Sequence, residues 1–434
     1  MATSKPTRIA LLSTIIQKNI EIIDAYFDSN GLPSPSFDQD YPSDLAPEIH
    51  GARNAVLEAT DELSDLMLGP RQIAECHPPQ HTSLVGIQAI NRWNVADNLE
   101  ENEEATFSEV SRRCGVHEDI FKRVMRQAIS KHIFKEPRDG VIAHNAASKL
   151  FRSPGLLPDY ISVALDDVWP SATRMLDAWG KWDFSQDPDK TGFNLVENTT
   201  SSYFQSMRSN EKRRKAFSNV MSYMQSRPGF GSGYSHMISA FDWNSVSKVI
   251  DIGGGLGDTG AYIVQNTSKT HYVVQDLPDV IEEAIGRGMY TELADRLTFM
   301  GHDFFQPQPM QNADAYFLRW ILHDWSDPQA MNILRCLIPA LKPGAHVIIQ
   351  EFVIPPRGTL SFYHEKSIRC MDLAMAATFN SKERDIEAWI HLFQSTDPRF
   401  KFAESNIANG SNMAIIRFTW DDSISVTGEP APTT

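Results

Sequence analysis

The sequence predicts an α/β fold, in which a parallel sheet follows a long helical region. From Trp243 onward, short apolar runs alternate with helical stretches, and this alternation builds a parallel sheet with right-handed crossovers. The expected strands are Val249–Ile252, Tyr272–Gln275, Leu297–Met300, Ala315–Leu318 and Val347–Gln350. Before Trp243, residues 160–240 have a helical pattern throughout, which the glycine-rich run Gly229–Gly233 interrupts.

The chain begins with amphipathic helices. Apolar side chains recur at spacings of three and four over residues 7–30, and Asn30-Gly31 ends this helix. The Pro/Ser/Asp-rich stretch Leu32–Pro47 is expected to be a linker or an extended arm. Val56–Leu68 then resumes the helical period.

Residues 105–144 have the pattern of a winged helix. Thr106 and Glu109 form a capping box that opens a short helix, and a second helix follows the turn at Gly115. A hairpin signal completes the unit, with two strands around a turn: His132–Glu136, Pro137–Gly140 and Val141–His144.

The C-terminal end predicts an antiparallel pair of strands. Phe400–Ser405 and Met413–Phe418 are separated by a short loop in which Asn409-Gly410 makes a tight turn. The expected domains are a helical domain over residues 1–241, a catalytic domain over 242–422 and a disordered tail over 423–434.

Composition excludes several functional classes. The 434 residues carry a net charge of −15, so the chain lacks the basic footprint that nucleic-acid binding requires. Basic side chains on the second helix of the winged-helix unit keep DNA binding as an alternative: Lys122, Arg123, Arg126 and Lys131. The 4 cysteines have no CxxC spacing and no apolar run reaches membrane-spanning length, which favours a cytoplasmic protein. We expect no metal, because only His77 and His81 have a ligand-like spacing and they lie in a Pro-Pro loop.

A glycine loop after the first expected strand predicts a nucleotide site. Gly253, Gly255 and Gly257 allow the backbone to approach a ligand closely, and Asp276 at the end of the next strand can accept hydrogen bonds from ribose hydroxyls. NAD and S-adenosylmethionine both fit such a loop. Asp258 stands where the third glycine of GxGxxG should be, and its charge would repel a pyrophosphate but tolerate a sulfonium, which favours S-adenosylmethionine.

A third strand also ends in an acid. Asp303, followed by Phe304 and Phe305, suits an adenine, because the acid can accept from the amino group and a ring can cover the flat face. The alternative is that Asp303 only caps a loop.

One histidine and two carboxylates form a predicted general-base site. His323 and Glu351 follow the fourth and fifth strands at the carboxyl edge, where ligands bind in such sheets. Glu383 opens a predicted helix, Arg384–Ser395. Neutral histidine accepts a proton while carboxylates orient it and stabilise the imidazolium. The alternative is a histidine that merely caps a helix.

Three motifs make the chain resemble the metal-independent, plant- and fungal-type small-molecule O-methyltransferases, and in particular fungal secondary-metabolite enzymes. They are Arg319–Asp327 (RWILHDWSD), Lys342-Pro343-Gly344 and Ser381-Lys382-Glu383-Arg384. The resemblance implies a class I, Rossmann-like methyltransferase sheet of seven strands with the last antiparallel, behind a helical winged-helix dimerisation domain. It also implies a homodimer.

The resemblance assigns roles to individual residues. S-adenosylmethionine, converted to S-adenosylhomocysteine, would contact Gly253, Gly255, Asp276, Asp303, Phe304 and Arg319, where the family has a lysine at the last position. His323 would be the catalytic base with Glu351 and Glu383. The residues implied near the acceptor are Phe217, Met221, Met224, Trp320, Asp324 and Met375. Met224 stands where plant members have a polar histidine, which disfavours plant-like phenylpropanoid acceptors.

The predicted reaction is methylation of a phenolic hydroxyl on an aromatic metabolite such as a polyketide. The main alternative is a pericyclase that keeps the fold and cofactor but transfers no methyl group, as some fungal relatives do. In that case His132 and His144 of the hairpin would be the candidate acids.

Overall fold

The computed structural model describes residues 5–40, 42, 45–226, 233–407 and 413–424. Its internal contacts divide the chain into two units. The first comprises Met1–Pro170, Asn210–Tyr223 and Gly358–Cys370, and the second comprises Ser171–Ser209, Met224–Arg357 and Met371–Thr434. The predicted turn Asn409-Gly410, most of the Gly229–Gly233 break and most of the 423–434 tail lie outside the described residues.

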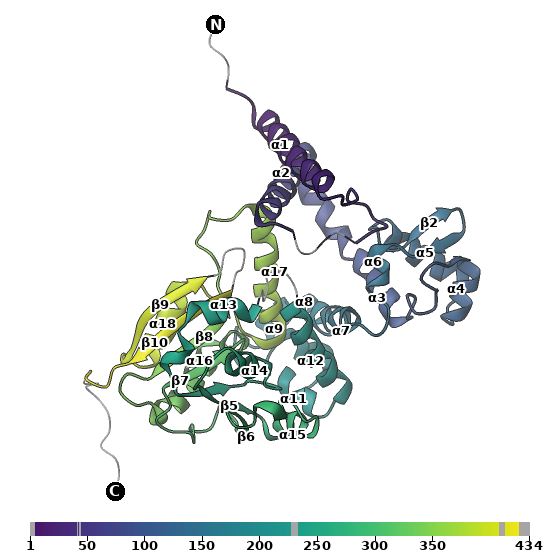
Figure 1. Ribbon diagram of the computed structural model, residues 1–434. Helices are drawn as coiled ribbons and strands as arrows, with labels where there is room; N and C mark the ends of the chain where they lie inside the picture. Colours follow the sequence, from purple (N-terminus) through teal and green to yellow (C-terminus); the bar gives the residue numbers. More distant parts are fainter. Residues whose placement is uncertain (1–4, 41, 43–44, 227–232, 408–412, 425–434) are drawn as a thin grey trace. The chain divides into compact units, whose positions relative to one another are not determined.

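The first unit begins with two helices that lie side by side, α1 (Arg8–Ser29) and α2 (Pro47–Gln80) (Figure 1). The Thr7 hydroxyl caps α1, and Gly31 follows its end in the left-handed region at φ 61°, which confirms the predicted helix. The predicted linker is one residue too long, because Pro47 is the first residue of α2, a position that tolerates its missing N–H. Gly69, at φ 70°, interrupts α2.

The winged-helix pattern is present in this unit. Its elements are α3 (Ser83–Arg92), β1 (Glu104–Thr106), α4 (Phe107–Arg113), α5 (Glu118–Ile129), β2 (Lys135–Arg138) and β3 (Val141–Ala143). The predicted capping box is formed, since the Glu109 amide donates to the Thr106 hydroxyl and the Thr106 amide donates to the Glu109 carboxylate. The three strands form one sheet in the order β1-β3-β2.

Further helices complete the first unit. They are α6 (Ala146–Lys149), α7 (Leu157–Ser162), the π-helix η1 (Val163–Val168), α8 (Trp169–Thr173, which ends in the second unit), α12 (Glu211–Ser226) and α17 (Phe362–Phe379). Polar contacts fix α12 to its neighbours, because Arg213 pairs with the buried Asp167 at 3.0 Å and the Asn219 amide donates to Asp159 at 2.6 Å. The last residues of α12 and of α17 belong to the second unit.

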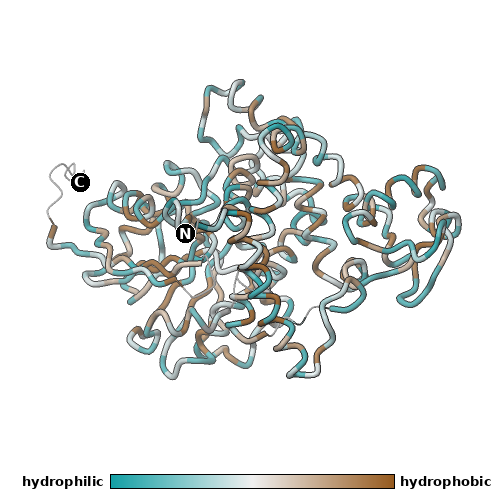
Figure 2. The backbone as a smooth tube through the Cα atoms, turned by 90° about the horizontal axis from the view of Figure 1, so that it is seen from above, coloured by the Kyte–Doolittle hydropathy of each residue, from teal (hydrophilic) through white to brown (hydrophobic). Residues whose placement is uncertain are grey.

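Hydropathy varies on a short scale along the chain. Short brown stretches alternate with teal ones in Figure 2, as amphipathic helices and buried strands require. Within the described residues, none of the helices combines the length and the apolar character that crossing a membrane would need.

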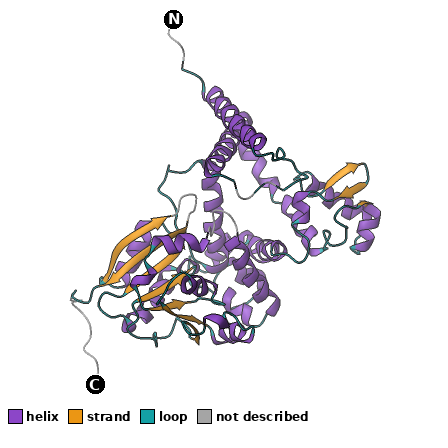
Figure 3. Ribbon diagram, viewed as in Figure 1, coloured by secondary structure: helices purple, strands orange, loops and turns teal. Residues whose placement is uncertain are grey.

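The second unit is built around a seven-stranded sheet (Figure 3). Its strands are β4 (Lys248–Ile252), β5 (His271–Asp276), β6 (Leu297–Gly301), β7 (Ala315–Arg319), β8 (His346–Phe352), β9 (Phe400–Ile407) and β10 (Met413–Trp420). All seven correspond to predicted strands. The order is β6-β5-β4-β7-β8-β10-β9, with β10 antiparallel to both neighbours, which confirms the expected sheet.

Helices cover both faces of this sheet. They are α13 (Gly233–Ala240), α14 (Asp258–Gln265), α15 (Pro278–Gly286), α16 (Asp327–Leu337) and α18 (Ile386–Thr396). The second unit also contains α9 (Met175–Lys181), α10 (Gly192–Glu197) and α11 (Tyr203–Arg208). Because side chains alternate along a strand, Ile250 packs with α16 and α18 on one face, whereas Val249 packs with α13 and α14 on the other. This two-sided burial explains why the central strands are continuously apolar.

Candidate active site

The glycine loop lies at the carboxyl end of β4. The amides of Gly253 and Gly254 donate to the Gln275 carbonyl on β5 at 2.8 and 2.9 Å, which holds the loop against the sheet. Gly253 has φ 74°, and a Cβ there would lie 2.4 Å from Cδ1 of Ile321. The left-handed conformation favours glycine at this position, where any larger residue would also displace the end of the Ile321 side chain. The helix α14 begins directly after the loop.

Asp276, the last residue of β5, contacts this loop, and its predicted role as a ribose acceptor stays a prediction. Its Oδ2 accepts from the Gly255 amide at 2.9 Å, and its Oδ1 accepts from the Leu277 amide at 2.7 Å. Burial raises the pKa of Asp276, while these two amide hydrogen bonds lower it. The carboxylate is therefore fixed beside the loop by backbone donors.

Asp303 does cap its own loop. Its Oδ1 accepts from the Phe305 amide at 3.0 Å. Phe304 and Phe305 both lie edge-on to Trp325, with ring centroids 6.0 and 4.8 Å apart. The structure thus shows the contact of the alternative interpretation, and the adenine role of Asp303 stays a prediction.

Arg319, the last residue of β7, is held within the sheet edge. Its Nε donates to Oε1 of Gln350 at 2.9 Å, and its guanidinium lies 5.6 Å from the ring centre of Tyr234. Burial lowers the pKa of Arg319, and the negative charge of Asp251 opposes this shift. Arg319 thus places a positive charge beside the glycine loop, and its guanidinium donates to the neutral side-chain amide of Gln350.

His323 lies between two carboxylates. It is in a single 3-10 turn, η4 (Leu322–Asp324), which follows β7. Its Nδ1 lies 3.0 Å from Oε1 of Glu383, and its Nε2 lies 3.5 Å from Oδ1 of Asp324. The side chain of His323 is 14% exposed and that of Glu383 is fully buried. The structure therefore brings His323 and Glu383 together as predicted, with Asp324 as a third member.

Glu351 contributes through the backbone and not through the imidazole. Its Oε1 accepts from the amides of Ile321 at 3.1 Å and Leu322 at 2.8 Å, the two residues that precede His323. Glu351 is near enough to His323 for its negative charge to contribute to the raised pKa of the histidine.

The buried charges of this cluster shift one another's pKa values. Burial lowers the pKa of His323, but the negative charges of Asp324 and Glu383 outweigh it and raise the pKa to about 10. Burial raises the pKa of Asp324 to about 6 and that of Glu351 to about 7. A buried cluster cannot hold several unbalanced charges, so a proton on His323 is favoured while Glu383 faces it.

One predicted boundary near this site is wrong. The sequence pattern starts a helix at Arg384, whereas the structure starts it at Ile386, because the Asp385 side chain caps it by accepting from the Ala388 amide at 2.7 Å. Arg384 instead pairs through its backbone with Val353 beyond the end of β8. Arg384 thus lies in an extended segment before the helix.

The residues implied near the acceptor fall in both units. Trp320 has φ 53°, and its Nε1 lies 3.0 Å from the Met413 sulfur. Met224 and Met375 also belong to the second unit. Phe217 and Met221 lie on α12 in the first unit, so their place around an acceptor stays a prediction.

Sequence reasoning missed two polar residues at this site. Gln350 fixes Arg319, and the Arg384 side chain, which is 1% exposed, pairs with Asp327 at 2.7 Å. A signal existed for both, because Gln350 directly precedes Glu351 in a buried strand and Arg384 directly follows Glu383.

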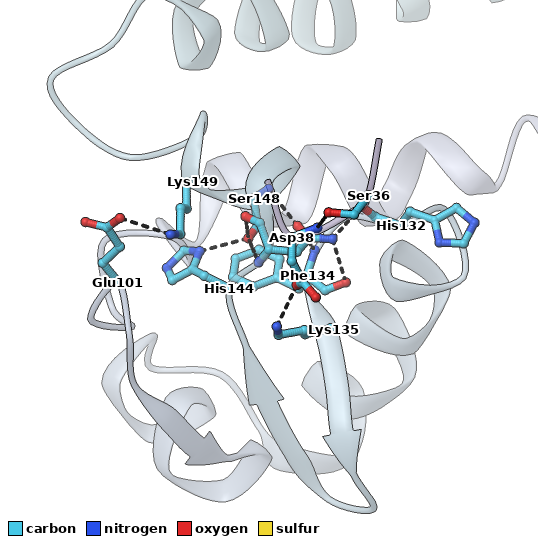
Figure 4. A network of polar contacts seen from close by, with 10 residues as sticks. Ser36, Asp38, Glu101, His132, Phe134, Lys135, His144, Ser148 and Lys149 are labelled. Atoms are coloured by element: carbon cyan, nitrogen blue, oxygen red, sulfur yellow. Dashed lines mark hydrogen bonds and ion pairs between the residues drawn. The ribbon is translucent and has the colours of Figure 1, made fainter. Parts of the chain in front are cut away.

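The predicted bounds of the hairpin are wrong, because β2 begins at Lys135 and β3 ends at Ala143, so both histidines lie outside its strands. The two histidines have different surroundings (Figure 4). His144 is buried, with Nδ1 2.8 Å from the Ser148 hydroxyl and Nε2 3.1 Å from the Leu99 carbonyl. Both ring nitrogens are thus occupied within the unit. His132 points away from this network and stacks on Phe37 at a centroid distance of 3.9 Å.

The basic helix α5 is partly neutralised. Arg126 pairs with Glu136 at 2.6 Å and with Asp139 at 2.7 Å, which weakens the case for DNA binding. Among the residues that the structure describes, no group of three or more His, Cys, Asp or Glu side chains is arranged to hold a metal ion.

Comparisons with known proteins identify the family of the chain. A family model described as an O-methyltransferase domain matches residues 190–397. The grayanic acid biosynthesis cluster O-methyltransferase of Cladonia grayi is 35% identical over 420 residues, which cover 95% of this chain and 88% of that protein. The chlorophenol O-methyltransferase of Trichoderma longibrachiatum is 31% identical, with 96% of this chain and 91% of that protein covered.

Solved structures share the fold at lower identity. OxaC, solved in complex with sinefungin and meleagrin, matches with a TM-score of 0.74 at 18% identity, over 94% of this chain and 99% of that one. A protein described as a pericyclic reaction enzyme matches with a TM-score of 0.71 at 19% identity, over 94% and 100% of the two chains. The full-length relatives and the matched domain show that the chain belongs to the S-adenosylmethionine-dependent O-methyltransferases of the fungal secondary-metabolite type.

Proposed function

We propose that this enzyme methylates a phenolic hydroxyl of an aromatic secondary metabolite, with His323 as general base and with aromatic polyketides as the first acceptor class to test. The observation that carries the proposal is the position of His323, partly buried after the end of β7 with Nδ1 3.0 Å from the buried Glu383 carboxylate. A histidine that only caps a helix has no need for a buried carboxylate on its ring.

The residues at the glycine loop fit S-adenosylmethionine. Gly255 has φ 58°, and no atom lies within 4 Å of where its Cβ would be, so the loop leaves open space that suits the close approach of a cofactor. Asp276 would hold the ribose hydroxyls and Arg319 the cofactor carboxylate, while Asp303 and Phe304 would hold the adenine. When bound, the cofactor supplies an electrophilic methyl group on a sulfonium.

The imidazole of His323 accepts the proton of the acceptor hydroxyl. A phenol has a pKa of about 10, close to that of His323, so the proton moves between phenol oxygen and imidazole at little cost. Glu383 stabilises the imidazolium that results, and Glu351 keeps the turn in place through the Ile321 and Leu322 amides. The remaining contribution is alignment of the acceptor oxygen.

The acceptor class is inferred from the apolar residues and the relatives. Phe217, Met221, Met224 and Met375 would supply a flat apolar lining, with Trp320 and Asp324 nearer the reacting oxygen. One relative is named for chlorophenol and another for grayanic acid biosynthesis. The first name is that of a phenol, which supports an aromatic acceptor for this chain.

We also propose a cytoplasmic homodimer. Apolar side chains on α1 are 40–46% exposed, which a second copy of the chain would cover: Ile9, Leu11, Ile20 and Ile22. Residues 1–241 would serve dimerisation and acceptor lining, and residues 242–422 cofactor binding and chemistry. All four cysteines are free, which supports a reducing compartment.

The alternative is a pericyclase that binds the cofactor without methyl transfer. The likeness to the pericyclic reaction enzyme favours it at the level of fold. Of the two histidines that such a reaction could use, His144 has both ring nitrogens occupied by Ser148 and by backbone carbonyls. This arrangement leaves His132 as the candidate acid, while the pairing of His323 with Glu383 favours methyl transfer.

The test is turnover on a panel of phenols. The enzyme is incubated with S-adenosylmethionine and polyketide phenols, and S-adenosylhomocysteine and a product heavier by one methylene unit are followed by mass spectrometry. Coupled formation of both supports the proposal. Tight cofactor binding with an isomerised product of unchanged mass would contradict it and support the pericyclase.

A further inference from the structure

The turn that carries His323 has little structure of its own. It is a single 3-10 turn, closed by backbone hydrogen bonds of 3.2 Å from the Asp324 amide and 3.3 Å from the Trp325 amide. Trp320, two residues before the turn, is in the left-handed region at φ 53°. A turn of this kind needs outside contacts to hold a side chain in one place.

Arg384 supplies such contacts on both sides of His323. Its Nη1 donates to the Leu322 carbonyl at 3.0 Å and its Nη2 donates to the Trp325 carbonyl at 2.9 Å. Its Nε and Nη2 also donate to Oδ1 of Asp327 at 3.0 and 2.7 Å. One planar guanidinium therefore joins the residue before His323, the residue after Asp324 and the first residue of α16.

Burial, an aromatic ring and a backbone hydrogen bond keep the Arg384 side chain in place. Its side chain is 1% exposed, and its carbon lies 4.7 Å from the ring centre of Trp389. Its backbone is tied to the residues that continue β8, because the Ile354 amide donates to the Arg384 carbonyl at 3.0 Å. Arg384 thus connects the turn to the same strand, β8, that carries Glu351.

Two adjacent residues then act on His323 in different ways. Glu383 contacts the imidazole, whereas Arg384 holds the main chain that carries it. Glu351 holds the amides of the same turn. Glu351 therefore fixes the turn through its backbone amides, and Arg384 fixes it through its backbone carbonyls.

We propose that Arg384 is a positioning residue for methyl transfer: its guanidinium fixes the turn so that His323 stays between Glu383 and Asp324. This inference rests on the proposed function, in which His323 is the base. Lysine cannot replace Arg384, because an ammonium lacks the planar fork that reaches two carbonyls and a carboxylate together.

The test compares Arg384→Lys with a matched control, Arg399→Lys. Arg399 also pairs with an aspartate, Asp397 at 2.7 Å, and lies 4.6 Å from the ring centre of Trp420. Arg399 lies beside the end of β10, and the end of β10 pairs with the start of β8. The His323 turn lies at the other end of these strands, where β7 and β8 finish. For both variants kcat, KM for each substrate, S-adenosylhomocysteine affinity by calorimetry and the pH dependence of kcat are measured.

We expect kcat of Arg384→Lys to fall by about 100-fold, the cost of a misplacement of about 1 Å, with cofactor affinity unchanged. The acidic limb of the pH profile should move to lower pH, because an imidazole that drifts from Asp324 and Glu383 loses the charges that raise its pKa. Arg399→Lys should keep the wild-type kcat and the wild-type limb.

A merely structural role gives a different result. If Arg384 only stabilises the fold, kcat per folded molecule and the acidic limb both stay at wild-type values, and the proposal is overturned. If Arg384→Lys does not fold, Asp327→Asn replaces it, since it loosens the guanidinium while leaving both carbonyl contacts. It should shift the limb in the same direction, and an unchanged limb would overturn the proposal. A His323→Gln variant with full turnover would instead refute the proposed function, so the two failures are distinguishable.

Discussion

Replacing Glu383 by glutamine tests the charge that faces His323 while keeping the shape of the side chain. In the native enzyme Oε1 of Glu383 lies 3.0 Å from Nδ1 of His323, and the Glu383 side chain is fully buried. The amide oxygen introduced by Glu383→Gln could still accept a hydrogen bond from Nδ1, so the ring orientation is kept. What is lost is the negative charge that stabilises the imidazolium.

The magnitude follows from this distance. Two unit charges 3.0 Å apart at an effective dielectric constant of about 20 attract by about 5.5 kcal/mol. The proton is transferred only in part in the transition state, so about half of this, about 2.7 kcal/mol, is expected to appear in the barrier. This corresponds to a decrease in kcat of about 100-fold.

The assay is initial-rate formation of S-adenosylhomocysteine with saturating acceptor, with cofactor affinity measured separately by calorimetry. We expect the pH-independent kcat at high pH, where His323 is neutral in both proteins, to fall by this factor while the cofactor affinity stays at the wild-type value. Because the neutral imidazole is the base, kcat rises with pH as His323 loses its proton. This acidic limb should move to lower pH in the variant, since the loss of a negative charge lowers the pKa of His323. A wild-type kcat, or an unchanged limb, would refute the reasoning.

Further predictions concern the remaining parts of the site and the core. Asp324→Asn removes another negative charge that raises the pKa of His323, so the acidic limb should again move to lower pH in rate measurements from about pH 6 to about pH 10. Asp276→Ala should weaken S-adenosylhomocysteine binding by at least about 10-fold in calorimetry, because a ribose acceptor is lost; wild-type affinity would exclude that role. Gly253→Ala should lower both cofactor affinity and thermal stability, since φ is 74° and its Cβ would collide with a neighbouring isoleucine side chain. Leu334→Ala, at a fully buried core position, should lower the free energy of unfolding by about 2–5 kcal/mol in denaturant titration, and a smaller change would mean that the site collapses around the cavity.

The sheet could be predicted from the sequence because its pattern is local. Strands buried on both faces are continuously apolar, and the run Val347–Gln350 lies within the observed β8 for this reason. The glycine loop and Asp276 could be placed because they follow strands at the same edge. The glycine loop and Asp276 meet because β4 and β5 are parallel neighbours, so the residues that follow them lie at the same end of the sheet.

The features that could not be predicted depend on side-chain and backbone contacts between segments that are distant in the sequence. The sequence pattern places the start of α18 two residues early, because the Asp385 cap and the pairing of Arg384 with Val353 compete with the helical pattern. The positions of His323 and Glu351 after adjacent strands predict proximity, but only the structure shows that Glu351 holds backbone amides. A guanidinium that spans two carbonyls and a carboxylate leaves no periodic signal.

The most direct test of the central claim is the rate of methyl transfer by His323→Gln, measured as S-adenosylhomocysteine formation under conditions in which the wild-type enzyme turns over. We expect kcat to fall by at least about 100-fold while cofactor affinity is unchanged, because the substitution removes the base and leaves the glycine loop intact. A variant that binds the cofactor normally and retains the wild-type kcat would show that His323 is not the base.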